Sequence, residues 1–185
     1  MIMRFSETPI PGAFEIQLSP LEDDRGVFTR IFCGNEFQQA GFQKNIVQVN
    51  HSVNRARGTV RGMHFQYPPH SEIKIIRCIK GKVFDVVVDI RKNSPTFMQW
   101  YAVELSPEKY NMILIPEGCA HGFQALEEDS ELLYFHSEFY HPESEGAFRF
   151  DDPFINIQWP LPAVQVSAKD KSYPLLDASF AGVAL

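Results

Sequence analysis

Short runs of β-branched and aromatic residues fill the middle of the chain, from about residue 44 to residue 138. Glycine, proline, asparagine or serine separates one run from the next, a pattern typical of short strands connected by turns. The expected strands are IVQVNHSV (46–53), GTVRGMHF (58–65), IKIIRCI (73–79), KVFDVVVDI (82–90), MQWYAVEL (98–105), NMILIP (111–116) and ELLYFHSEF (131–139). This spacing predicts an all-β sandwich or barrel.

Helical segments are few. Residues 35–40 fit one or two turns of helix, and we expect a second short helix after Pro174. Prolines at positions 153, 160, 162 and 174 predict that the C-terminal fifth is an extended wrapping segment rather than a second domain. The chain contains no internal repeat, so we expect one domain over residues 1–185.

Alternation along 46–53 gives one strand an unusual face. Gln48, Asn50 and Ser52 share that face, while valines occupy the other one. A polar uncharged face is either the solvated outside of an antiparallel sheet or the lining of a barrel that holds a polar ligand. The pattern alone leaves both interpretations open.

Composition excludes several classes of protein. The chain is 44% hydrophobic and 22% charged, with a net charge of −6, which is typical of a soluble globular domain and argues against a nucleic-acid surface. No run of apolar residues is long enough to span a membrane, so we expect no membrane partner. Cys33, Cys78 and Cys119 are odd in number and widely spaced, which favours reduced thiols and a cytoplasmic location.

Two histidines and a glutamate cluster in RGMHFQYPPHSEIK (61–74) and raise the question of a metal. A metal-binding barrel would need two imidazoles on one strand face, but Gln66 stands two residues after His64. His70 falls in a proline-containing loop with Glu72 nearby, and His121 comes much later. This set is poor for a divalent ion, so we expect no metal.

A role in proton transfer requires fewer groups. Neutral imidazole can remove a proton next to a carbonyl if a carboxylate orients it and a cation stabilises the enolate oxygen. His64 and Lys74 supply the base and the cation, and Asp85, Asp89 and Asp170 are the candidate carboxylates. The residues themselves do not choose among these three.

Other chemistries lack their motifs. The chain has no GxGxxG, phosphate-binding loop, GxSxG or HExxH sequence. Cys119 stands two residues before His121 and could imitate a nucleophile with its base, but a packed core thiol is the better interpretation.

Eight segments taken together resemble the dTDP-4-dehydrorhamnose 3,5-epimerases, which act on nucleotide-linked sugars. The segments are DDRGVFTR (23–30), QVNHS (48–52), GTVRGMHFQYPP (58–69), KGKVFDVVVDIRKNSPTFMQW (80–100), IPEGCAHGF (115–123), YHPESE (140–145), DDPFINIQWP (151–160) and SAKDK (167–171). The resemblance implies a cupin-like jelly-roll barrel without metal or cofactor. It also implies a homodimer in which an N-terminal segment reaches the neighbouring active site.

The same resemblance implies a role for individual residues. His64 corresponds to the general base, Asp170 to the carboxylate that orients it, Lys74 to the cation beside the keto oxygen, and Tyr134 to the acid on the opposite face of the sugar. The remaining positions correspond to substrate contacts: Arg61 and the partner's Arg25 at the diphosphate, Gln48, Asn50 and His121 in the pocket, and Phe28 and Tyr140 near the nucleotide base.

Three positions depart from the family pattern. Arg30 stands where an acid is usual, Glu72 replaces a usual glutamine, and Phe135 follows the expected acid where lysine is common. His70 and Glu72 are expected to be bystanders. The alternatives are a mono-epimerase on a related nucleotide sugar, a metal-binding cupin, and a sugar-binding module without turnover.

Overall fold

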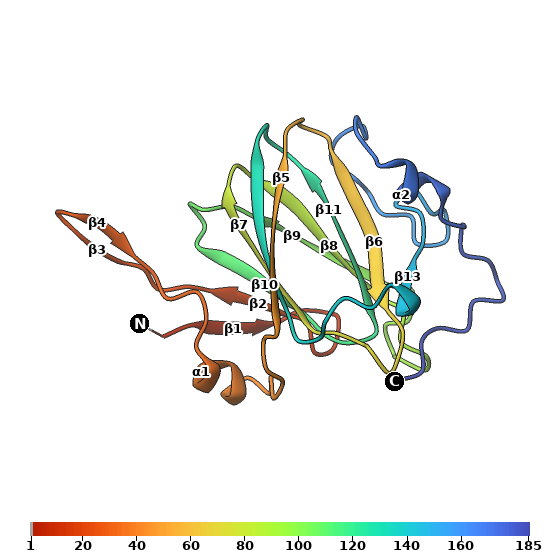
Figure 1. Ribbon diagram of the computed structural model, residues 1–185, viewed down its shortest axis with the longest axis horizontal. Coiled ribbons are helices and arrows are strands. Elements are labelled where there is room, and N and C mark those ends of the chain that lie inside the picture. Colours follow the sequence, from red (N-terminus) through yellow and green to blue (C-terminus); the bar gives the residue numbers. More distant parts are fainter. Residues whose placement is uncertain (1) are drawn as a thin grey trace.

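The computed structural model describes residues 2–185 and contains two antiparallel sheets and a projecting hairpin (Figure 1). The larger sheet has the order β1 (Arg4–Glu7), β2 (Phe14–Gln17), β10 (Asn111–Ile115), β7 (Lys74–Lys80), β12 (Ser130–His136) and β5 (Gln48–Asn54). The smaller sheet has the order β13 (Glu145–Ala147), β6 (Val60–Gln66), β11 (Cys119–Ala125), β8 (Val83–Asp89) and β9 (Trp100–Leu105). The hairpin pairs β3 (Leu21–Asp23) with β4 (Gly26–Phe28). The all-β prediction is confirmed.

All seven expected strands are present, with ends that differ by a few residues. The run predicted over 46–53 forms β5 over Gln48–Asn54, and the one predicted over 98–105 forms β9 over Trp100–Leu105. Strand β11 and the short strands β1 to β4 and β13 were not predicted. The short strands have only three or four residues each, too few to show an alternating pattern, whereas the seven residues of β11 (Cys119–Ala125) do not alternate between polar and apolar side chains.

The first helix lies near its predicted position, but the second prediction was wrong. Helix α1 spans Gly34–Gln39, whereas α2 spans Ala168–Ser172 and therefore precedes Pro174. The Ser167 side chain caps α2 by accepting a hydrogen bond from the Asp170 backbone N–H at 2.9 Å. Tyr173 is already extended, as expected for a residue before proline. A single 3-10 turn, η1, spans Pro142–Ser144.

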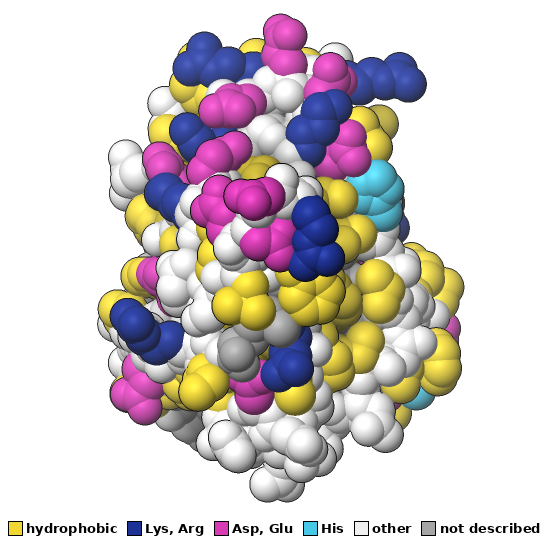
Figure 2. All heavy atoms as spheres, turned by 90° about the vertical axis from the view of Figure 1, so that its left-hand side faces the viewer, with side chains coloured by type: hydrophobic (Ala, Val, Ile, Leu, Met, Phe, Trp, Pro, Cys, Tyr) yellow, Lys and Arg dark blue, Asp and Glu magenta, His cyan; other side chains and the backbone are white. Residues whose placement is uncertain are grey.

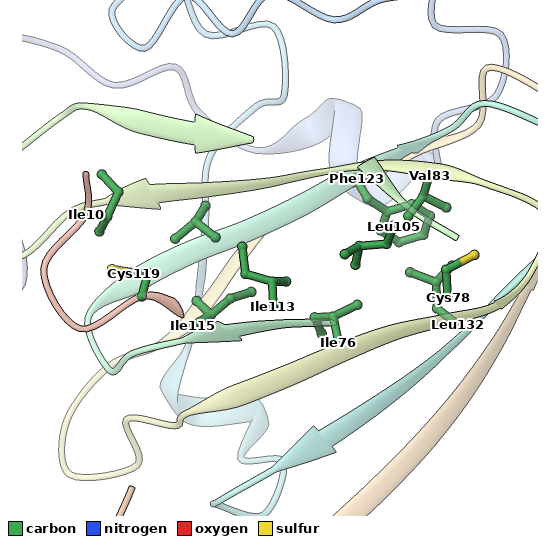
Figure 3. Packing of buried hydrophobic residues seen from close by; sticks show 12 residues of the cluster. Ile10, Ile76, Cys78, Val83, Leu105, Ile113, Ile115, Cys119, Phe123 and Leu132 are labelled. Atoms are coloured by element: carbon green, nitrogen blue, oxygen red, sulfur yellow. The ribbon is translucent and has the colours of Figure 1, made fainter. Parts of the chain in front are cut away.

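The main core lies between the two sheets, where inward apolar side chains from β7, β10 and β12 face those from β8, β9 and β11 (Figure 3). Two of the cysteines belong to this core. Burial raises the pKa of the Cys78 thiol to about 11 and that of Cys119 to about 12, so both thiols stay protonated and inert. The prediction that Cys119 is a packed core thiol is confirmed.

The C-terminal segment covers the outer face of the smaller sheet, as its prolines predicted. Phe148, Ile155 and Ile157 pack against Met63 on β6 and against valines of β8. Figure 1 shows this part of the chain, coloured blue, passing along β6 with α2 beside that strand. The wrapping segment thereby brings residues 168–172 to the barrel.

Strands β6 and β11 approach each other so closely that their contact requires glycine. Gly62 has φ +135°, and a Cβ atom there would lie 2.6 Å from the Cα atom of Gly122. Two residues further along β6, His64 pairs directly with His121 of β11. The glycine contact therefore fixes the separation of the two strands that carry these histidines.

Gly62→Ala is expected to lower the free energy of unfolding by about 3 kcal/mol, since it combines an unfavourable φ with a backbone clash. Chemical denaturation measures this change. Gly34→Ala is the matched control, because a Cβ at Gly34 meets no atom within 4 Å, and it should shift stability by less than about 1 kcal/mol. Equal stability of the two variants would contradict the close approach.

Candidate active site

Two adjoining cavities, of about 560 and about 280 Å³, open among the strands of the barrel. Four side chains line both of them: Asn50, His64, Lys74 and His136. These residues come from β5, β6, β7 and β12, so both sheets contribute to the junction between the cavities.

The polar face of β5 lines the cavities rather than the solvated outside. Gln48 borders the larger cavity, Ser52 borders the smaller one, and Asn50 borders both. On the opposite face Val49 is 54% exposed and Val53 is 46% exposed. The strand thus turns its polar side chains toward the cavities, so this face is a cavity lining rather than the solvated outside of the sheet.

His64 is held by the carboxylate of Asp170. Its Nε2 lies 2.8 Å from Asp170 Oδ1, and the Asp170 side chain is almost fully buried. Burial alone would raise the pKa of Asp170, but its hydrogen bond with His64 holds that pKa below its usual value. An ionised carboxylate accepts the Nε2 hydrogen and leaves Nδ1 as the basic nitrogen of a neutral ring.

The two other candidate carboxylates have different partners. Asp85 contacts His121, whose Nε2 lies 2.9 Å from Asp85 Oδ2, and complete burial raises the pKa of Asp85 although His121 opposes the shift. Asp89 binds Arg91 through two hydrogen bonds in a turn after β8. Asp170 is therefore the carboxylate that orients His64.

Lys74 lies inside the barrel and makes two polar contacts. Its Nζ donates to the His64 carbonyl at 3.3 Å and forms an ion pair with Glu72 at 3.0 Å. Glu72 also accepts a hydrogen bond from His136 Nδ1 at 2.7 Å. Glu72 lines the larger cavity and pairs with Lys74, whereas the sequence alone assigned it no role.

His136 is a cavity residue that the sequence interpretation missed. It follows Tyr134 by two residues on β12, so it shares the face that carries the expected acid. The two rings stack with centroids 6.2 Å apart. The alternation that identified the polar face of β5 would also have identified His136.

Tyr134 borders the smaller cavity, together with His64, His121 and Lys74. Its hydroxyl hydrogen-bonds the Ser52 hydroxyl at 3.0 Å. Burial raises the pKa of the phenol above its ordinary value, so the group keeps its proton at neutral pH. A protonated hydroxyl and the His64 imidazole therefore border the same cavity.

Most of the expected binding residues lie at these cavities. Arg61 and His121 border the smaller cavity, and the Arg61 Nε donates to Asn54 at 2.8 Å. Tyr140 borders the larger cavity, where its backbone N–H donates to Gln48 at 3.2 Å.

Arg25 and Phe28 lie elsewhere, on the hairpin that projects from the body (Figure 1). The Arg25 side chain is 90% exposed and pairs with Asp23 of the same hairpin. Within a single chain neither residue lines the two cavities. The role of Arg25 at the active site of a partner and the position of Phe28 near the nucleotide base stay predictions.

Of the three residues that depart from the family pattern, Arg30 and Phe135 make their contacts away from the cavities. Arg30 pairs with Glu36 of α1 at 3.0 Å. Phe135 is buried and packs in a core cluster under the larger sheet. Neither borders the two cavities, whereas Glu72 does.

The barrel histidines do not form a metal site within residues 2–185. His64 and His121 each bind their own carboxylate. The single group of three potential ligands found in this part of the chain is His70, His141 and Glu143. The two imidazoles stack in nearly parallel planes with centroids 3.5 Å apart, so their lone pairs do not converge on one ion.

Comparison with known proteins decides the family. The family model described as dTDP-4-dehydrorhamnose 3,5-epimerase matches residues 7–178. The Salmonella typhimurium dTDP-4-dehydrorhamnose 3,5-epimerase is 42% identical over 173 residues, covering 92% of this chain and 94% of the relative. The chain belongs to the dTDP-4-dehydrorhamnose 3,5-epimerase family.

Solved structures of the family share the fold. An Elizabethkingia anophelis dTDP-4-dehydrorhamnose 3,5-epimerase superposes with a TM-score of 0.92 at 34% identity, covering 97% of this chain and 100% of that one. The Legionella pneumophila dTDP-6-deoxy-D-glucose-3,5-epimerase, in complex with dTDP-4-keto-L-rhamnose, has a TM-score of 0.91 at 36% identity, with 98% of each chain covered. The expected cupin-like barrel of the epimerase family is confirmed.

No helix in residues 2–185 has the length and hydrophobicity to cross a membrane.

Asp89→Asn tests whether Asp89 stabilises the turn after β8 and has no role in the candidate active site. Its hydrogen bonds with Arg91, Ser94 and Thr96 lower the pKa of Asp89 to about 2, against the opposing effect of burial. Because the folded pKa is depressed, the stabilisation is present above the unfolded pKa and is lost as pH falls through about 2. We expect Asp89→Asn to lower the free energy of unfolding by about 2 kcal/mol at pH 7 and by less near pH 2, with little change in activity. Chemical denaturation at several pH values measures this change. A loss of stability that is the same at every pH would contradict an ionised Asp89 carboxylate.

Proposed function

We propose that this protein epimerises a nucleotide-linked 4-keto-6-deoxyhexose, and that dTDP-4-dehydro-6-deoxyglucose is its substrate and dTDP-4-dehydrorhamnose its product. The observation that carries the proposal is one cavity lined by His64, which pairs with Asp170, by Tyr134 and by Lys74. The relatives that are 42% and 36% identical to this chain are named as epimerases of dTDP-linked 6-deoxy sugars, which supports the same substrate class here.

His64 begins the reaction as the base. The keto group at carbon 4 acidifies the hydrogens on carbons 3 and 5, and His64 Nδ1 takes one of these protons. The electrons of the broken C–H bond form the C=C bond of an enolate, and the negative charge moves to the keto oxygen. The Lys74 ammonium stabilises that oxygen in a partly enclosed, low-dielectric site.

Tyr134 completes the inversion. Its phenol donates a proton to the enolate carbon from the face opposite His64, the C=C electrons form the new C–H bond, and the carbonyl returns. Solvent then removes the proton from His64 and restores the one on Tyr134. The raised pKa of Tyr134 keeps the phenol protonated before the reaction, while a carbanion-like carbon is basic enough to take that proton.

The nucleotide diphosphate requires local cations, because the chain as a whole carries a net charge of −6. Arg61 supplies one at the smaller cavity, and the larger cavity leaves room for the nucleotide beside Tyr140. The two ring carbons are inverted by the same groups. A mono-epimerase would contain these groups too.

Tyr134→Phe separates removal of the proton from its return. The variant keeps the ring and loses only the hydroxyl, so His64 and Lys74 still form the enolate. We expect deuterium from heavy water to enter carbons 3 and 5 with retained configuration, while epimerisation falls at least about a hundredfold. NMR of the recovered sugar measures both. A parallel decline of exchange and inversion would assign Tyr134 to binding instead.

We further propose that the enzyme works in the cytoplasm as a homodimer. The outward valines of β5 and the exposed Val27 and Phe28 of the hairpin form apolar surface that a second copy would bury. Figure 2 shows the hairpin side of the molecule, where apolar side chains lie exposed between charged ones. The 90% exposed Arg25 would then supply a second cation to the diphosphate of the partner. The free cysteines fit a reducing compartment.

Mixing two inactive variants tests the shared site. Arg25→Ala protein keeps its own base, and His64→Ala protein keeps its hairpin arginine. If the hairpin of one chain serves the cavity of the other, a mixed dimer contains one site with both residues intact. We expect up to about a quarter of wild-type activity after subunit exchange, because half the dimers are mixed and each restores one of two sites. No recovery despite exchange demonstrated by mass spectrometry would contradict a site shared between chains.

A further inference from the structure

Besides Asp85 and His121, a second pair of ionisable groups inside the barrel has no part in the proton transfers described above. They are Glu72 and His136, whose side chains are 9% and 11% exposed. Burying a charge is costly unless a partner compensates it, so both groups need a physical reason to be in the cavity lining.

Strand register places the two groups around Lys74. His136 of β12 is the direct cross-strand partner of Lys74 on β7, and Glu72 precedes Lys74 by two residues. One oxygen of Glu72 lies 3.0 Å from Lys74 Nζ, and the other lies 2.7 Å from His136 Nδ1. The carboxylate therefore bridges the two neighbouring side chains.

The bridge restricts the direction of the ammonium group. An ammonium has three N–H donors. One is directed to Glu72 and another to the backbone carbonyl of His64 at 3.3 Å, so the third is left for an oxygen in the cavity. Because a lysine side chain has many rotamers, two fixed acceptors are a simple way to aim the third donor.

His136 holds the carboxylate in turn. An ionised carboxylate only accepts hydrogen bonds, so His136 Nδ1 carries the hydrogen. In the neutral ring Nε2 is then an acceptor, and the Asn50 amide nitrogen lies 3.3 Å from it. Hydrogen bonds therefore link Asn50 through His136 to Glu72, and an ion pair links Glu72 to Lys74.

We propose that Glu72 is the positioning residue that aims Lys74 at the enolate oxygen, and that His136 and Asn50 hold Glu72 in that orientation. This inference rests on the proposed function. The negative charge of Glu72 opposes the field of Lys74, so what it contributes is direction. An uncharged acceptor of the same shape should serve as well or better.

Three variants test this role through the turnover number for exchange at carbon 3. Glu72→Ala frees Lys74, and we expect kcat to fall by about 10- to 100-fold while KM stays constant or decreases. Glu72→Gln retains an acceptor for Lys74 and should keep kcat within about threefold of the wild type or above it.

Glu131→Ala is the matched control. Glu131 also bridges a histidine and a lysine, with His51 at 3.0 Å and Lys80 at 3.3 Å, but it lies at the surface and outside the cavity lining. This variant should keep wild-type kcat. Unchanged kcat in Glu72→Ala, or an increase of KM alone, would overturn the positioning role.

A spectroscopic measurement is independent of turnover and of the folding of the Glu72 variants. Nitrogen-15 NMR of the wild-type protein, assigned with His136→Gln, should show neutral His136 as the Nδ1–H tautomer. The Nε2–H tautomer would overturn the bridge. Absence of exchange by wild-type protein on the nucleotide sugar would instead overturn the proposed function, which the tautomer measurement does not test.

Discussion

The hydrogen bond between His64 and Asp170 joins two parts of the chain that are 106 residues apart. One part is the inner strand β6, and the other is the short helix α2 of the wrapping segment. The apolar contacts of that segment with the smaller sheet deliver the carboxylate, and the Ser167 cap fixes its backbone. The packing of an outer layer thus determines which nitrogen of an inner imidazole is basic.

The interior of the barrel keeps its charges in compensated pairs. Asp85 pairs with His121, Glu72 pairs with Lys74, and Asp170 pairs with His64. Each pairing offsets a desolvation cost that would otherwise neutralise the group or destabilise the fold. The same pairs give the cavity fixed dipoles before the substrate arrives, which is the condition for stabilising a developing enolate without reorganisation.

Most of the long central strands could be predicted from the sequence because runs of β-branched and aromatic residues between turn residues mark them, whereas β11 has a mixed sequence and was missed. The polar face of β5 could also be recognised, although alternation does not say whether such a face lies inside or outside. The second helix was misplaced because Pro174 was taken as its start, whereas Ser167 caps it from the other side. Glu72 and His136 could not be paired from sequence, because 64 residues and the register of β7 with β12 separate them.

The resemblance to the epimerase family supplied the roles of His64, Asp170, Lys74 and Tyr134. Local sequence patterns supplied only the roles of His64 and Lys74. The choice of Asp170 over Asp85 and Asp89 depends on tertiary packing that no local pattern encodes. For the hairpin residues Arg25 and Phe28 the resemblance supplied a role that the tertiary structure of one chain does not explain. The structure of one chain leaves them far from the cavity, and a shared site would need a second chain.

Solvent exchange by two variants at the His64–Asp170 pair tests the account most directly. In heavy water, with dTDP-4-dehydro-6-deoxyglucose as substrate, His64→Asn should incorporate no deuterium at carbon 3 or carbon 5, because the variant has no base. Asp170→Asn should exchange more slowly than wild type but detectably, because the imidazole remains and only its orientation and tautomer are disturbed. Exchange at the wild-type rate by His64→Asn would contradict the account.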